Sequence, residues 1–216
     1  MSDRDDTDRL SAASLARDDP TGWFDRLYTE ALAGSATVPW DRPERSALLA
    51  GWAERGVPAG RTALVVGCGP GRDAEFISSL GFATTAFDIA PTAIRIARER
   101  YPDSAVDYRV ADLLAPPDEW REAFDLVIES NNVQALPRVF RERATASVSG
   151  FVAPGGTLVV IAALVPEPGE QGPPWPLTRA EVDAFARDGL REVSFEEVAI
   201  PDDPLVRRGR AVFTRA

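Results

Sequence analysis

Residues 62–73 read Thr62-Ala-Leu-Val-Val-Gly67-Cys-Gly-Pro-Gly71-Arg-Asp73, and they are the strongest indication of fold in the sequence. The apolar run 62–66 predicts a short strand that is buried on both faces. Glycines at alternate positions let the backbone turn sharply and approach a ligand closely. The helix expected next, over residues 72–80, offers free N–H groups to an anionic or polar group.

Strands and helices alternate from this point to residue 162. The apolar patterns predict strands over 83–87, 106–110, 124–129 and 157–162, and helices over 91–100 and 136–151. Short connections between them indicate a parallel sheet with helices on both faces. A helix over 178–187 and two strands, 192–200 and 207–214, follow, with Pro201-Asp-Asp-Pro204 joining the strands. We expect an α/β, Rossmann-like, seven-stranded and mostly parallel sheet whose last strand is antiparallel.

The N-terminal part has a different pattern. Residues 1–19 are charged and weakly apolar, and we expect a flexible segment there. An apolar helical face begins near Trp23 and ends at Gly34, and a second helix is expected from Glu44 to Arg55. Residues 20–58 are therefore expected to form a helical lid on a core of residues 62–216, within one domain of residues 20–216.

The composition excludes several kinds of chemistry. The 216 residues include no histidine and one cysteine, and the net charge is -10. Histidine-dependent hydrolysis, histidine-ligated zinc and an internal disulfide are excluded. The negative charge disfavours a nucleic-acid partner, and no apolar run reaches the roughly 20 residues that cross a bilayer. The polar N-terminus is unlike a targeting signal, so we expect a cytoplasmic protein.

Three acidic residues end neighbouring strands of the predicted sheet. In wound α/β sheets, ligands bind beyond the carboxyl ends of the strands. Asp88 can accept hydrogen bonds from both hydroxyls of a ribose, Asp112 can accept one from an adenine amino group, and Glu129 ends the next strand. A dinucleotide fingerprint requires glycine where Arg72 stands, whereas G-x-G-x-G followed by two such acids is typical of S-adenosylmethionine sites. The alternative is a tight turn followed by solvated strand ends.

Several segments together resemble one known family. Gly67-Cys-Gly-Pro-Gly-Arg-Asp73, Leu80-Gly81 and Phe87-Asp88-Ile89-Ala90 look like the thiopurine, thiol and halide methyltransferases. Val38-Pro39-Trp40-Asp41 is similar to the T-P-W-D of that family. Phe124–Glu129 with Ala135-Leu136-Pro137, Pro154-Gly155-Gly156, and Gly172-Pro-Pro-Trp175 with Glu181 and Phe185 complete the resemblance, which spans residues 20–214.

This resemblance implies a class I methyltransferase that uses S-adenosylmethionine, releases S-adenosylhomocysteine and needs no metal. Its acceptor would be a small molecule, preferably a thiol or thiolate, and a monomer is expected. The cofactor-binding residues would be Trp40, Gly67, Cys68, Gly69, Gly71, Asp73, Asp88, Ile89, Asp112, Leu113, Glu129 and Ser130. The substrate-binding residues would be Trp23, Tyr28, Asn132, Gln134 and Trp175.

Catalysis would depend on alignment of the reactants, and no residue is assigned as a general base. Ser130-Asn131-Asn132 stands where many family members carry an arginine, just after the acid Glu129 that ends the fourth strand, and Asn131 and Asn132 are candidates to orient an acceptor. The runs Arg95–Arg100 and Arg138–Arg143 are interpreted as solvated helix faces. O- or N-methylation of a natural product and a silent cofactor-binding module remain alternatives, while a nicotinamide oxidoreductase is disfavoured by Arg72.

Overall fold

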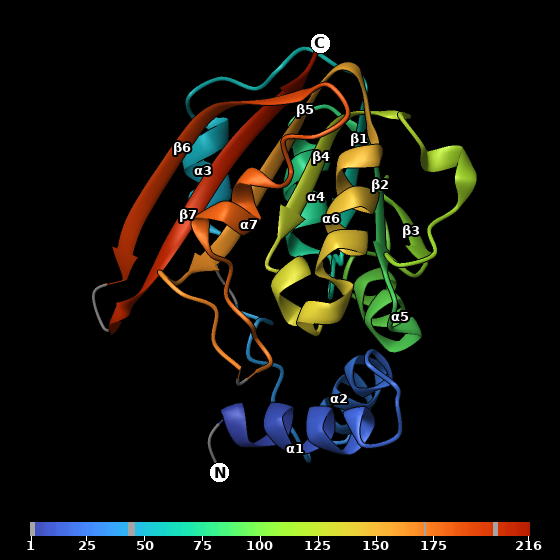
Figure 1. The fold of residues 1–216 in the computed structure, drawn as a ribbon. Helices are drawn as coiled ribbons and strands as arrows, with labels where there is room; N and C mark the ends of the chain where they lie inside the picture. The colour runs from blue at the N-terminus through green and yellow to red at the C-terminus, as the bar shows by residue number, and fades with distance from the viewer. Residues whose placement is uncertain (1–2, 43–45, 171, 201–202) are drawn as a thin grey trace.

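A computed structural model describes residues 3–42, 46–170, 172–200 and 203–216. The chain alternates helices and strands as the sequence predicts (Figure 1). The strands are β1 (Thr62–Val66), β2 (Ala83–Asp88), β3 (Asp107–Val110), β4 (Phe124–Ser130), β5 (Val152–Leu164), β6 (Leu190–Ile200) and β7 (Asp203–Arg215). The α-helices are α1 (Asp3–Leu15), α2 (Gly22–Leu32), α3 (Ala47–Ala53), α4 (Arg72–Ser79), α5 (Pro91–Arg100), α6 (Arg141–Gly150) and α7 (Arg179–Asp183), with short 3-10 turns η1 (Asp118–Trp120), η2 (Val133–Ala135) and η3 (Arg138–Phe140).

The strands form one seven-stranded sheet in the order β3-β2-β1-β4-β5-β7-β6. β1 pairs in parallel with both β2 and β4, so the chain winds outward in two directions from the centre. β7 runs antiparallel to β5 on one side and to β6 on the other. The predicted fold class, with an antiparallel last strand, is confirmed.

Helices cover both faces of the sheet, and each face has its own apolar core. One core joins Leu64, Val127 and Val160 to α6 and α7. The other joins Val65, Ile128 and Ile161 to α3, α4 and α5. Alternate strand residues belong to opposite cores, which explains why these strands read as continuous apolar runs.

Several elements differ from their predicted form. Residues 3–15, expected to lie in a flexible segment, form α1, whose buried face is mostly polar: Asp6, Thr7, Leu10, Ser11 and Ser14. Helix α3 was expected to be part of the lid, but its Leu49 and Trp52 are buried in the apolar core that also contains α4 and α5. The expected helix over 136–151 begins only at Arg141, and β5 begins at Val152, five residues before the expected strand over 157–162. The expected helix start at Glu44 and the link at Pro201 and Asp202 lie outside the described residues.

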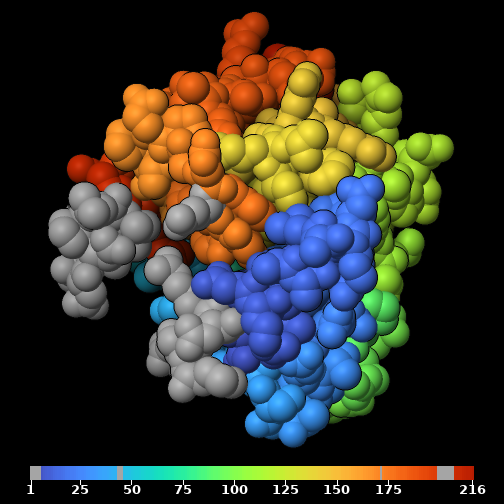
Figure 2. Space-filling view, turned by 60° about the horizontal axis from the view of Figure 1, so that its bottom comes forward, coloured from blue at the N-terminus to red at the C-terminus, as the bar shows by residue number. Residues whose placement is uncertain are grey.

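Helices α1 and α2 lie across the carboxyl ends of the parallel strands, below the sheet in Figure 1 and facing the viewer in Figure 2. Two carboxylates join these helices and the loop after them, residues 3–42 and called the lid below, to α5. Asp25 accepts a 2.8 Å hydrogen bond from the Thr92 amide in the first turn of α5. Asp41 accepts two hydrogen bonds of 2.8 Å from Arg100 at the end of α5. The lid therefore lies directly over the edge at which α/β sheets bind ligands.

No helix among the described residues is both long enough and apolar enough to span a membrane.

Candidate active site

The turn after β1 requires its glycines for two reasons. Gly67, Gly69 and Gly71 have φ angles of +54°, +51° and +93°, a region that other residues rarely adopt. A Cβ atom at these positions would lie 1.8 Å from Asn132 Oδ1, 2.9 Å from the Tyr28 hydroxyl and 2.4 Å from the Tyr108 hydroxyl, respectively. The glycines therefore let the side chains of Asn132, Tyr28 and Tyr108 pack directly against the backbone of this turn.

Asp88 stands at the end of β2, beside this turn, and organises it. One carboxylate oxygen accepts the Gly69 amide and the other accepts the Ala90 amide, both at 2.9 Å. The residue is 7% exposed, and burial raises its pKa to about 6. Each carboxylate oxygen has a second lone pair, so Asp88 keeps capacity for two further donors such as vicinal hydroxyls.

Asp112 lies two residues after the end of β3, the strand that pairs with β2 and therefore ends beside Asp88. Its Oδ1 accepts the Leu114 amide at 2.8 Å, and the Ala111 amide donates to the Asp88 carbonyl at 3.1 Å. Leu113 is buried in the core on the α6 face, while Ile89 is partly exposed. The structure therefore brings Asp88, Ile89, Asp112 and Leu113 to one edge, as the sequence predicts.

The donors and acceptors of this edge suit an adenosyl group that carries an amino acid. Asp88 and Asp112 accept hydrogen bonds where a ribose and an adenine amino group would donate them, and glycines leave room for the backbone to approach. S-Adenosylmethionine, when bound, supplies a methyl group on a positively charged sulfur. The residues of this edge would bind and orient that group.

Two further cofactor candidates have structural partners. Asp73, in the first turn of α4, is mostly buried, which raises its pKa, and the Ser46 amide donates a hydrogen bond to it. Cys68 packs against the α3–α5 core, and burial raises the pKa of its thiol well above the usual value. A protonated, packed thiol is a poor nucleophile, in agreement with a packing role.

The aromatic residues of the lid form one cluster above Gly69. Trp40 Nε1 donates a 2.7 Å hydrogen bond to the Tyr28 hydroxyl, and the two rings pack edge to face. Trp23 is 2% exposed and stacks on Phe24, with 3.9 Å between the ring centroids. Trp40 stays 42% exposed. Trp23 thus belongs to the core of the lid, whereas Tyr28 and Trp40 reach the glycine turn.

The turn after β4 is shaped by Glu129, which is fully buried. Its Oε1 accepts the amides of Asn132 and Val133 at 2.7 and 2.9 Å, while Oε2 is buried without a hydrogen-bond partner among the described residues. Burial raises the pKa of Glu129 to about 7. Ser130 is partly exposed and accepts a hydrogen bond from the Asn131 side chain, and Asn131 has φ +64°.

The amide group of Asn132 is already engaged within the protein. Its Nδ2 donates to the Val66 carbonyl at 2.7 Å and to the Ser130 carbonyl at 3.0 Å, which ties the end of β1 to the turn after β4. Asn132 therefore has a structural task that its sequence position does not reveal. Its contact with an acceptor stays a prediction, as does that of Asn131.

Gln134 and Trp175 lie together but as structural partners. Gln134 Oε1 accepts the Ala163 amide at 2.8 Å, and the Gln134 carbonyl accepts the Trp175 amide at 2.7 Å. Trp175 Nε1 donates to the Glu170 carbonyl, and the residue is 8% exposed. Gln134 therefore holds Trp175 and the end of β5 in place, and contact of either with substrate stays a prediction.

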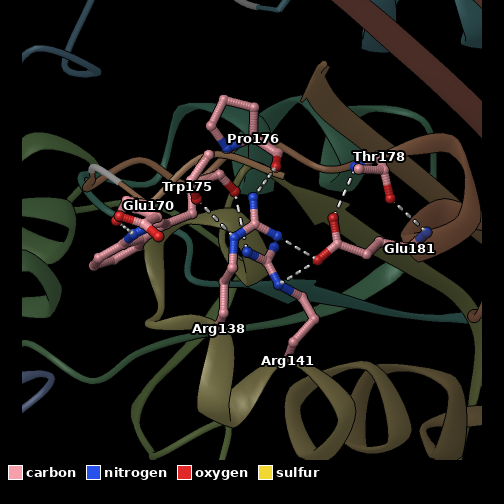
Figure 3. Close-up of polar contacts among 8 residues, drawn as sticks. Arg138, Arg141, Glu170, Trp175, Pro176, Thr178 and Glu181 are labelled. Atoms are coloured by element: carbon pink, nitrogen blue, oxygen red, sulfur yellow. Dashed lines mark hydrogen bonds and ion pairs between the residues drawn. The ribbon is translucent and has the colours of Figure 1, made fainter. Parts of the chain in front are cut away.

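A pair of arginines holds the segment that carries Trp175 (Figure 3). Arg138 donates to the carbonyls of Gly169 and Pro176 and, at 2.7 Å, to Glu181. Arg141 donates to the Trp175 carbonyl at 3.1 Å and is 8% exposed. Interpretation of Arg138–Arg143 as a solvated face was therefore wrong at Arg138 and Arg141, because the loop folds back over them.

Comparison with known proteins finds similarity to methyltransferases over part of the chain. Residues 63–156 match the family model described as "Methyltransferase domain". A ubiquinone biosynthesis O-methyltransferase of Xanthomonas axonopodis pv. citri (strain 306) is 37% identical over 82 residues, which make up 37% of this chain and 34% of that protein. The match thus spans about a third of the length of this curated relative.

Two solved structures share the fold over most of their length. N-methyltransferase NodS from Bradyrhizobium japonicum WM9, in complex with S-adenosylhomocysteine, has a TM-score of 0.70 at 21% identity, covering 88% of this chain and 98% of that one. The [4+2]-cyclase SpnF has a TM-score of 0.68 at 18% identity, covering 91% and 96%. At such identities the likeness shows the fold alone, and the two names show that this fold serves more than one reaction.

The narrower resemblance to thiopurine, thiol and halide methyltransferases stays a prediction. The family match and the topology establish a coarser statement: residues 63–156 match a methyltransferase domain, and they lie within a fold that the chain shares with the N-methyltransferase NodS.

Proposed function

We propose that this protein transfers a methyl group from S-adenosylmethionine to an acidic hydroxyl group, such as a phenol or an enol, of a small molecule. The observation that supports this cofactor is the hydrogen bond from Gly69, in the glycine turn, to the Asp88 carboxylate, with Asp112 beside it. The curated relative named as an O-methyltransferase supports an oxygen acceptor.

The chain's own residues divide into two tasks. Asp88 and Asp112 would hold the ribose and the adenine, and the amides of the 67–71 turn would meet the methionine part. Tyr28 and Trp40 cover Gly69 and would exclude water from the reacting centre. Exclusion of water and alignment of the acceptor are the main contributions that such a site makes.

The acidity of the acceptor follows from the absence of histidine. A neutral alcohol must lose a proton during methylation, which calls for a general base. The chain contains no histidine. Asp88 uses both carboxylate oxygens to accept backbone amides, and Glu129 uses Oε1 for two amides while its Oε2 is buried, so neither acid is open to solvent as a general base. A hydroxyl that ionises in water by itself needs no such base.

A thiolate is the second candidate acceptor, because it too needs no general base and because the motifs of residues 38–41, 67–73 and 172–185 resemble the thiol-methylating family. We keep the predictions of a monomer and of a cytoplasmic location alongside this proposal.

Two measurements test the proposal. Calorimetry with S-adenosylhomocysteine and with NAD identifies the cofactor, and we expect binding of the first and not of the second. Labelled S-adenosylmethionine is then offered with matched panels of phenols and thiols. Labelled phenol ethers support the oxygen acceptor, and labelled thioethers alone support the sulfur acceptor. Binding of S-adenosylhomocysteine with no transfer to either panel would indicate a silent binding module, and NAD binding alone would overturn the proposal.

A further inference from the structure

The loop after α2, residues 33–42, carries Trp40 to the glycine turn. Trp40 Nε1 lies 3.9 Å from the place that a Cβ on Gly69 would take. This nitrogen also donates to the Tyr28 hydroxyl, and Tyr28 is 2% exposed. Asp88, which binds the Gly69 amide, is nearly as buried. A ligand bound to Asp88 and this turn would therefore lie against Tyr28 and Trp40, and its release would depend on how firmly their loop is held.

The backbone around Trp40 makes hydrogen bonds within the loop. The Asp41 amide donates to the Val38 carbonyl at 3.1 Å, and the Arg42 amide donates to the Trp40 carbonyl at 3.0 Å. Arg42 Nε donates to the Pro39 carbonyl at 3.2 Å. These bonds set the shape of the loop but do not attach it to the core.

The side chain of Asp41 attaches the loop to two helices of the core. Its two oxygens accept hydrogen bonds of 2.8 Å from Nη1 and Nη2 of Arg100, the last residue of α5. Oδ1 also lies 3.5 Å from Nη2 of Arg72, the first residue of α4, which directly follows the glycine turn. The hydrogen bonds from Arg100 lower the pKa of Asp41, so this carboxylate is ionised at neutral pH. Pairing of both oxygens with one guanidinium is among the stronger polar contacts in proteins.

A second attachment of the lid is independent of this bridge. Asp25, in α2, accepts the Thr92 amide at 2.8 Å in the first turn of α5. Helix α5 has 10 residues, so its two ends lie about 15 Å apart. Loss of the bridge at Asp41 would therefore loosen the loop around Trp40 while α2 stays docked on α5.

We propose that Asp41 is a positioning residue: its bridge to α4 and α5 fixes Trp40 against the glycine turn and thereby slows the release of an S-adenosyl ligand. That such a ligand binds here rests on the proposed function, whereas the position of Trp40 is a property of the protein without any ligand. Loss of the bridge should change both the mobility of Trp40 and the rate of release.

Hydrogen exchange of the Trp40 indole N–H tests the effect on mobility in the ligand-free protein. Asp41→Asn keeps the shape of the side chain but removes its charge. We expect the indole N–H, assigned by comparison with Trp40→Phe, to exchange about tenfold faster in Asp41→Asn. Glu99→Gln is the matched control, because it removes an exposed carboxylate of α5 that pairs with Arg95 on the same helix. It should leave the exchange of Trp40 unchanged.

Surface plasmon resonance with S-adenosylhomocysteine tests the effect on release. The dissociation rate constant should rise about tenfold in Asp41→Asn and stay unchanged in Glu99→Gln. Raising the salt concentration from about 0.1 M to about 1 M should speed release from the original protein more than from Asp41→Asn, because salt screens the ion pair. Asp41→Glu restores the charge and should return both the exchange rate and the release rate toward their original values. A general loss of stability would not follow the charge in this way.

Arg100→Met removes the partner instead of the acid, and it replaces Asp41→Asn if that variant does not fold. The same faster exchange and faster release are expected. Unchanged indole exchange in Asp41→Asn and Arg100→Met overturns the proposal, as does faster exchange with an unchanged release rate. If S-adenosylhomocysteine does not bind at all, the proposed function fails, and the exchange of Trp40 alone decides whether Asp41 holds the loop.

Discussion

The turns after β1, β2 and β3 and the turns after β4 and β5 lie at the same edge of the sheet but are held in different ways. We call residues 67–73, 88–91 and 110–114 the cofactor side and residues 129–137 and 164–178 the acceptor side, although the second group begins with Glu129 and Ser130, which the sequence predicts to contact the cofactor. On the cofactor side, a single carboxylate, Asp88, binds amides of its own turn and of the neighbouring turn. On the acceptor side, Arg138 and Arg141 reach across 31 to 43 residues of sequence to hold the loop.

This difference matches the tasks proposed for the two sides. A cofactor that is always the same can be bound by backbone groups and two acidic side chains, so its site needs few other side chains. An acceptor is met by side chains, and side chains need support from other elements to stay in one position. The comparison predicts that changes on one side leave the other side intact, and the following experiments test that separation.

Asp88→Asn is expected to have the largest effect. The substitution keeps the shape but removes the charge, so hydrogen bonds to ribose hydroxyls and to the Gly69 amide weaken together. We expect the Kd for S-adenosylhomocysteine to rise about 100-fold, from the loss of roughly 3 kcal/mol. Calorimetry measures this, with Asp112→Asn as the milder comparison at about tenfold. An unchanged Kd in Asp88→Asn would remove Asp88 from the cofactor site.

The cofactor side could be predicted from the sequence because its determinants are local. The strand 62–66, the glycines after it and the acid that ends the next strand all lie within 27 residues of one another. Positive φ angles favour glycine, and a strand end places its acid at the edge of a parallel sheet. Thus Gly67, Gly69, Gly71 and Asp88 lie where expected.

The acceptor side and the lid could not be predicted as well. Arg141 looks like a solvated residue in the sequence, because its partner Trp175 is 34 residues away. Helix α1 buries Asp6, Thr7, Ser11 and Ser14, so it lacks the apolar period from which helices are inferred. Asn132 carries the same chemical signal whether it orients a ligand or, as here, bonds to the Val66 carbonyl.

The two sides can also be compared by the pH dependence of the free energy of unfolding, because each side contains a buried acid, Asp88 or Glu129. Burial raises their pKa values from 3.8 to about 6 and from 4.5 to about 7. The folded chain therefore holds protons that the unfolded chain has already lost, and the free energy of unfolding falls as pH rises from about 4 to about 7. Each group contributes up to about 3 kcal/mol to this fall.

Urea unfolding across this pH range measures the effect. Asp88→Asn and Glu129→Gln should each flatten the profile, the first mainly below pH 6 and the second up to pH 7. Asp125 is a useful control, because the amides of Arg61 and Thr62 lower its pKa and its contribution has the opposite sign. A profile that neither substitution flattens would show that both acids are solvated in the folded protein.

Gly69→Ala should have a smaller effect, and it tests the contact between the cofactor side and the lid. A Cβ at φ +51° is strained and would lie 2.9 Å from the Tyr28 hydroxyl. We expect a loss of about 2 kcal/mol in the free energy of unfolding. Gly155→Ala, at φ +76° with nothing within 4 Å, reports strain alone, at about 1 kcal/mol. Adding Tyr28→Phe to Gly69→Ala should recover the difference. No recovery would mean that the hydroxyl does not crowd this position.

Thr178→Ala is expected to have the smallest effect and to stay on the acceptor side. Thr178 Oγ1 accepts the Glu181 amide, and the Glu181 side chain accepts the Thr178 amide, which together cap α7. Loss of the hydroxyl should cost about 1 kcal/mol of stability. Glu181 keeps its ion pair with Arg138, so the loop should hold its position. The Kd for S-adenosylhomocysteine should therefore stay unchanged while the unfolding midpoint falls, and a weaker Kd would show that the two sides are not independent.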